Sequence, residues 1–267
     1  MADYIQLSYV DLGLASLLVL LNAALSLVLQ LRLERRLLIA AARMVVQLFL
    51  VGLVLKTLFT LVSPWLTALA MLAMGLFAGR EIMARQERRL RGWWGYGLGT
   101  LTMITAGMLI TILALTTQIG ADPWYNPRFA IPLFGMVLGN CMTGISLGLH
   151  NLTTQVVREK PAIEAQLILG ASRWQALRPF TRQALSSGFM PIINSMAATG
   201  LVALPGMMTG QILAGVPPTE AVKYQLLIMF LIGGSTGIGV LMAVHGAVWR
   251  LTDTRDRLRL DRLQEKK

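Results

Sequence analysis

The sequence predicts an all-α, polytopic membrane protein, and three observations lead to that prediction. The first is composition: 55% of the 267 residues are hydrophobic and only 14% are charged, with a mean hydropathy of +0.62. A soluble domain carries roughly 25% charged residues, so this chain has too few to cover a surface that faces water. The second observation is a series of long apolar stretches, and the third is the placement of basic residues between them.

Seven apolar stretches are long enough, or nearly so, to cross a bilayer. A hydrocarbon core about 30 Å thick is spanned by about 20 apolar residues of helix, because unpaired backbone groups are too costly in lipid. We expect about seven transmembrane helices near residues 9–31, 37–59, 64–79, 93–115, 131–152, 184–204 and 224–249.

Two of these stretches need a separate argument. The first differs from a signal peptide because its leader carries Asp3 and no basic residue, and a basic cluster follows the apolar run. The third is short, but without it the basic cluster at residues 80–91 would lie on the opposite side of the membrane from the other clusters. We therefore count both as spans.

The basic residues predict an outer amino terminus and an inner carboxyl terminus. Cytosolic segments of membrane proteins are enriched in Lys and Arg. In this orientation 21 of the 24 Lys and Arg residues lie inside, and only Lys56, Arg128 and Lys223 lie outside. The net charge of +11 is then mostly an orientation signal, and the short clusters do not form the basic face that nucleic acid requires.

The whole chain, residues 1–267, is expected to be a single transmembrane domain with no soluble domain attached. Two hydrophilic segments stand out. Residues 153–183 divide five spans from two and are expected in the cytosol, as is a basic tail at residues 250–267.

The chain lacks the sequence of a phosphate-binding loop. That loop ends in Gly-Lys-Ser/Thr, and none of the five lysines here follows a glycine. We therefore expect no ATP hydrolysis by this chain and no cofactor of its own. A transporter built from it is passive, coupled to an ion gradient, or driven by a separate ATPase.

The inner segment contains a short amphipathic helix. Ile163, Leu167 and Gly170 share one face, Glu164 and Ile168 share the next stripe, and Gly170 offers a place for the helix to end. Such an element fits a groove on a partner protein. The alternative is a helix that lies flat on the lipid surface with Arg173 and Trp174 at the headgroups.

Glu164-Ala165, with Gly170 six positions after the glutamate, resembles the Glu-Ala-Ala-x-x-x-Gly coupling motif of ABC-transporter permeases, with Gln166 in the third place. Nearly the whole chain resembles the FetB-type (UPF0014) family of iron-export ABC permeases. The segments that carry the resemblance are Arg43-x-x-x-Gln47-Leu48-x-x-Val51-Gly52, Ile131-Pro132-x-x-Gly135-Met136-x-x-Gly139-Asn140, Leu169-Gly170-Ala171, and Leu204-Pro205-Gly206-Met207-Met208-x-Gly210 through Lys223-Tyr224-Gln225.

The resemblance implies the membrane-spanning permease subunit of an ATP-driven exporter for metal ions such as iron. It implies a homodimer in a bacterial inner membrane, with ATP and Mg²⁺ bound by a separate cytosolic ABC ATPase. The residues expected to couple to that ATPase are Glu164, Ala165, Leu169, Gly170, Ala171 and Arg173. The alternative is an ion-coupled secondary carrier or a channel for a small solute.

Polar and sulfur-bearing residues at membrane depth are candidates for the translocation pathway, because burying polar groups in lipid is expensive. They are Arg43, Gln47, Met136, Asn140, Asn194, Met207 and Met208. Arg43 could instead reach the inner interface, and the others could form contacts between helices. No metal ligands are assigned: thioethers favour soft metals over iron, and the only acid within a span is Asp11.

Overall fold

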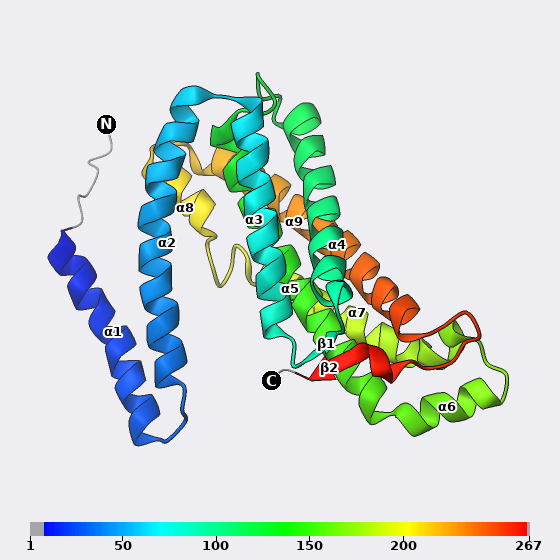
Figure 1. Ribbon diagram of the computed structural model, residues 1–267. Coiled ribbons are helices and arrows are strands. Elements are labelled where there is room, and N and C mark those ends of the chain that lie inside the picture. Colours follow the sequence, from blue (N-terminus) through cyan, green and yellow to red (C-terminus); the bar gives the residue numbers. More distant parts are fainter. Residues whose placement is uncertain (1–7, 266–267) are drawn as a thin grey trace. The chain divides into compact units, whose positions relative to one another are not determined.

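The computed structural model describes residues 8–265 and is mainly helical (Figure 1). The chain forms two compact units, which are described separately. The first unit ends at Leu61 and the second begins at Val62.

The first unit is a hairpin of two apolar helices, α1 (Tyr9–Val28) and α2 (Glu34–Leu61). A capping box starts α1, because the Ser8 hydroxyl accepts from the Asp11 amide and the Asp11 carboxylate accepts from the Ser8 amide. Ser26 ties the turn together: its hydroxyl accepts from the Leu33 amide and donates to Glu34, both at 3.0 Å. Most apolar side chains of this hairpin are exposed, as expected for helices that lipid or other protein covers.

The second unit contains the remaining elements. In chain order they are α3 (Pro64–Arg85), β1 (Arg88–Leu90), α4 (Trp93–Leu113), the π-helical turn η1 (Ala114–Gln118), α5 (Pro127–Arg158), α6 (Lys160–Ile168), α7 (Arg173–Ala198), α8 (Gly206–Leu213), α9 (Pro218–Leu251), the 3-10 turn η2 (Leu260–Arg262) and β2 (Leu263–Glu265).

The core of the second unit lies where α5, α7 and α9 pack closely. A Cβ atom on Gly144 of α5 would lie 2.8 Å from the backbone oxygen of Gly188 in α7, and one on Gly188 would lie 2.5 Å from Val240 of α9. Cys141 is fully buried beside them. Small residues let these backbones approach, which is how helices associate in a membrane.

Six helices within residues 8–265 are long and apolar enough to cross a membrane. They are α1, α2, α3, α4 extended by η1, α5 and α9. The predicted class, a helical polytopic membrane protein, is confirmed. The exact count of seven spans and the orientation stay predictions.

The stretch expected at residues 184–204 does not form one helix. It is divided between α7, which begins earlier at Arg173, and a turn in which Gly200 has a φ of +92°. Arg178 and Arg182 lower the hydropathy of the first half of α7, so apolar content alone misses where this helix begins. The hydrophilic segment at residues 153–183 is accordingly helical over most of its length.

Candidate functional site

The short helix α6 is held at its start and ends at a glycine. Ile163 is fully buried and anchors the helix to the core of the second unit. At the other end the Gly170 amide donates to the Leu167 carbonyl at 3.1 Å, and the Ala171 amide donates to the Gln166 carbonyl at 3.0 Å. This is a Schellman motif, and Gly170 occupies its left-handed position with a φ of +90°.

The end of α6 exposes two large apolar side chains. Ile168 is 85% exposed and Leu169 is 87% exposed, whereas Ile163 is buried and Leu167 is partly buried. The expected face of Ile163 and Leu167 therefore packs inward. An exposed apolar pair beside a fixed turn is the kind of feature that marks a protein interaction site. We call Ile168 and Leu169 the apolar tip; Leu169 was predicted as a coupling residue and Ile168 was not.

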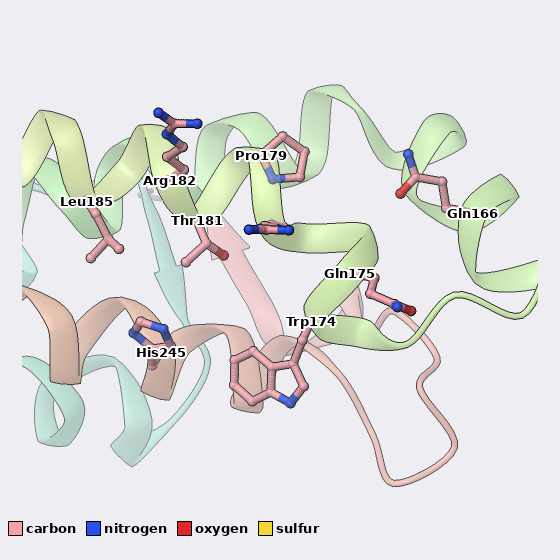
Figure 2. Close-up of a pocket in the computed structure, with 9 residues that line it drawn as sticks. Gln166, Trp174, Gln175, Pro179, Thr181, Arg182, Leu185 and His245 are labelled. Carbon is pink, nitrogen blue, oxygen red and sulfur yellow. The ribbon is translucent and has the colours of Figure 1, made fainter.

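A cavity of about 920 Å³ lies beside the coupling segment, between the first half of α7, the end of α9 and α6 (Figure 2). Trp174 and His245 form one wall, with ring centroids 5.9 Å apart and planes tilted by 35°. The cavity is lined by Gln166, Trp174, Gln175, Arg178, Pro179, Thr181, Arg182, Leu185 and His245.

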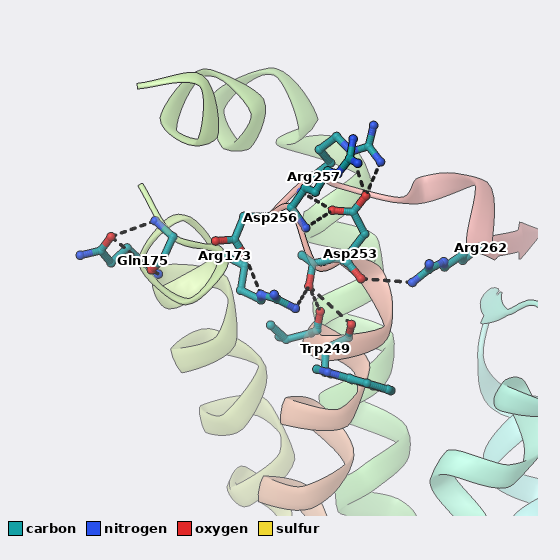
Figure 3. A network of polar contacts seen from close by, with 11 residues as sticks. Arg173, Gln175, Trp249, Asp253, Asp256, Arg257 and Arg262 are labelled. Carbon is teal, nitrogen blue, oxygen red and sulfur yellow. Dashed lines mark hydrogen bonds and ion pairs between the residues drawn. The ribbon is translucent and has the colours of Figure 1, made fainter. Parts of the chain in front are cut away.

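Arg173, a predicted coupling residue, is fixed at the start of α7. The helix begins with a capping box in which the Ser172 hydroxyl accepts from the Gln175 amide and the Gln175 side chain accepts from the Ser172 amide. The Arg173 guanidinium then forms an ion pair with Asp256 at 2.5 Å and donates to the Thr252 hydroxyl at 3.4 Å (Figure 3).

The predicted tail is folded back on the second unit over its described residues. Its strand β2 pairs antiparallel with β1, so Leu263 lies opposite Leu90. Arg262 donates to the carbonyls of Arg250 and Thr252, at 2.7 Å and 3.1 Å, which satisfies carbonyl groups at the carboxyl end of α9.

Two carboxylates hold the tail in this shape. The Asp253 carboxylate accepts from the backbone amide and the guanidinium of Arg257, and these hydrogen bonds lower the pKa of Asp253 to about 2. The Arg259 guanidinium donates two hydrogen bonds to Asp261 and lowers the pKa of that carboxyl to about 2. The tail is therefore ordered and contacts α9, β1 and α7.

The predicted pathway residues lie on separate elements. Met136 and Asn140 are one turn apart on α5, and the side-chain amide of Asn140 donates to the Met136 backbone carbonyl at 2.9 Å. Asn194 is exposed on α7, while Met207 and Met208 lie in the first turn of α8. Arg43 and Gln47 lie one turn apart on α2, in the first unit. None of the five candidates in the second unit lines the cavity beside α6. Their joint role in a pathway stays a prediction.

No group of three or more His, Cys, Asp and Glu side chains within residues 8–265 is arranged to hold a metal ion. The sequence likewise assigns no metal ligand.

These features define a helical membrane protein with a fixed turn after α6 and a folded tail. Residues 9–251 match the model of a family described as Uncharacterised protein family (UPF0014). The UPF0014 membrane protein slr1647 of Synechocystis is 38% identical over 251 residues, which cover 92% of this chain and 94% of the relative. The probable iron export permease protein FetB of Escherichia coli is 30% identical over 256 residues, or 96% of each chain. The UPF0014 membrane protein STAR2 of rice is 33% identical over 231 residues, which cover 86% of this chain and 79% of STAR2.

The chain belongs to the UPF0014 family, and it is an integral protein of a bacterial membrane. No solved structure matches it.

Proposed function

We propose that this protein is the membrane-spanning permease subunit of an ATP-driven exporter for metal ions such as iron. The relative FetB, named a probable iron export permease, supports the class of cargo. The apolar tip of α6 is the observation that carries the proposal of a separate motor, because two exposed large apolar side chains are costly to leave in water.

In this proposal a cytosolic ABC ATPase binds ATP and Mg²⁺ and receives the apolar tip in a groove. Closure of the ATPase pair then moves α6, and the movement reaches α5 and α7, which flank it in the chain. The ion pair between Arg173 and Asp256 holds the start of α7 in a fixed position next to the apolar tip. Two copies of the chain enclose the pathway in the inner membrane, and the pathway residues named above line it.

The test is purification of the complex in mild detergent with matched variants. We expect Ile168→Ser combined with Leu169→Ser to reduce co-purification of the ATPase at least tenfold. The control combines Leu201→Ser with Val202→Ser, a second apolar pair that is 94% and 85% exposed but lies in the turn after α7.

The control variant is expected to keep the ATPase. Equal ATPase recovery from both variants would show that the tip is not the docking site. A chain that purifies alone and catalyses flux driven by an ion gradient would replace this proposal with a secondary carrier or channel.

A further inference from the structure

The cavity beside the predicted coupling segment has no role in the function proposed above. It lies entirely within the second unit and is bounded by side chains of α6, α7 and α9 (Figure 2). A volume of about 920 Å³ is large enough for a small organic molecule or a metal complex. The charge of the lining side chains indicates which kind of ligand the cavity binds.

The cavity lining is cationic and contains no carboxylate. Arg178 and Arg182 lie one turn apart on α7, where like charges repel each other. Neither guanidinium forms an ion pair or a hydrogen bond with any residue in the range 8–265 that the structure describes. By contrast, Arg173 on the same helix is paired with Asp256. Both side chains are exposed, so their guanidinium groups are free to pair with an anion that enters the cavity.

The other lining groups add hydrogen-bond donors and a flat wall. His245 donates from Nδ1 to the Leu241 carbonyl at 2.8 Å, so its Nε2 is an acceptor and the donors for an anion come from the other lining side chains. The Gln175 carbonyl oxygen accepts from the Ser172 amide, which leaves the Gln175 NH₂ group as a donor. Trp174 covers one side of this set with its ring. Guanidinium forks and amide donors beside an aromatic wall suit carboxylate or phosphate groups.

We propose that this cavity binds an anionic ligand with carboxylate or phosphate groups, and that the exporter takes its metal as such an anionic complex. The second clause rests on the proposed function. Two unpaired guanidinium groups repel a bare metal cation, and no cluster of metal-ligating side chains within residues 8–265 offers that cation another site. The ligands of the metal are then supplied by the cargo itself.

The experiment measures binding to the chain alone in nanodiscs of zwitterionic lipid. Ferric citrate, citrate, inorganic phosphate and ferrous ion are titrated separately, with calorimetry and intrinsic tryptophan fluorescence as readouts. Ferric citrate and citrate are expected to bind, and ferrous ion alone is not. The variant Arg178→Gln with Arg182→Gln is expected to lose at least tenfold in affinity for ferric citrate.

The matched control is Arg158→Gln with Arg255→Gln, two cytosolic-side arginines outside the cavity lining. It is expected to bind as the unaltered chain does, and circular dichroism checks that both variants are folded. No anion binding, or equal binding by both double variants, would overturn the proposal. Binding of ferrous ion alone, or displacement of citrate by phosphatidylglycerol added to the nanodisc, would overturn the assignment of the cavity to an anionic metal complex.

The result is independent of the proposed motor. Because the ATPase is absent from the titration, loss of ATPase docking in other experiments leaves the binding result intact. If the chain binds anions but never associates with an ATPase, the proposal of an ATP-driven exporter fails and the proposal of an anion site stands. The failures of the two proposals are therefore distinguishable.

Discussion

Arg173 of α7 and Asp256 of the tail form an ion pair across 83 positions of sequence, with 2.5 Å between Nε and Oδ1. The Arg173 side chain is only 18% exposed, so its charge depends on this partner more than a surface charge would. The pair joins the predicted coupling segment to the end of the chain. The tail therefore contacts the residue at which α7 begins.

We expect Asp256→Asn to weaken coupling, because the half-buried guanidinium loses its carboxylate and the start of α7 loses its anchor. The predicted effect is a three- to tenfold fall in transport by the complex with unchanged membrane insertion. Glu220→Gln is the matched control, since Glu220 pairs with Lys223 at the exposed, opposite end of α9. A normal transport rate in Asp256→Asn would show that the tail does not act on α7.

Gly170 provides a second prediction about the same segment. Its φ of +90° strains any residue with a Cβ atom, although nothing lies within 4 Å of the place where that atom would be. We expect Gly170→Ala to cost about 1 kcal/mol locally and to fray the end of α6, with a several-fold loss of coupling. Gly170→Trp should uncouple transport more strongly and still insert.

Gly139→Ala is the control for this prediction, because Gly139 also has open space but lies within the regular helix α5. Transport coupled to ATP hydrolysis is the measurement, beside the amount of each variant in the membrane. Transport that is fully coupled to ATP hydrolysis in Gly170→Trp would show that the turn at Gly170 has no role in coupling.

Much of the fold could be predicted from apolar length and charge placement. The helices α1, α2, α3, α4, α5 and α9 each coincide with all or most of one predicted span, because lipid imposes a minimum apolar length that hydropathy reveals. The start of α7 could not be found in this way. Arg178, Arg182 and two interior prolines make the helix look like a loop, and its packing against α5 and α9 stabilises it together with the capping box at its start.

The candidate site was predictable where its geometry is local. The end of α6 at Gly170 follows from the preference of glycine for a left-handed helix end. The pairing of Arg173 with Asp256 and of β1 with β2 is tertiary, and no spacing in the sequence indicates it. The tail therefore looks like a solvated run of charges until its contacts are seen.

Gly188 leads to a prediction about stability. A Cβ atom there would lie 2.5 Å from Val240 and 3.0 Å from the Gly144 carbonyl, and backbone atoms cannot give way as a flexible side chain can. We expect Gly188→Ala to destabilise the packing of α5, α7 and α9 by about 1 to 3 kcal/mol. Thermal unfolding in detergent measures this, with Gly139→Ala expected to match the unaltered protein. An unchanged unfolding temperature for Gly188→Ala would mean that the three helices are packed less closely than described.

The two carboxylates of the tail predict how its local fold depends on pH, because both bond to arginines of the tail itself. The pKa values of Asp253 and Asp261 are both lowered to about 2, from an ordinary value of about 3.9. For a lowered pKa, the contribution to stability is fully present above the unfolded value and is lost as the pH falls through the folded value. The local fold of the tail should therefore be kept from pH 5 to 8 and loosen between about pH 4 and pH 2.

A fluorophore on Gln264→Cys reports the order of the tail, because Gln264 is exposed and Cys141 is buried from the label. Anisotropy should be constant from pH 8 to pH 5 and fall below about pH 4. In a second protein with Asp253→Asn and Asp261→Asn, neutral side chains cannot form the charged hydrogen bonds, so anisotropy should already be reduced at pH 7 and lack the acid transition. A transition centred above pH 5, or an unchanged one in the double variant, would assign the order of the tail to groups other than these carboxylates.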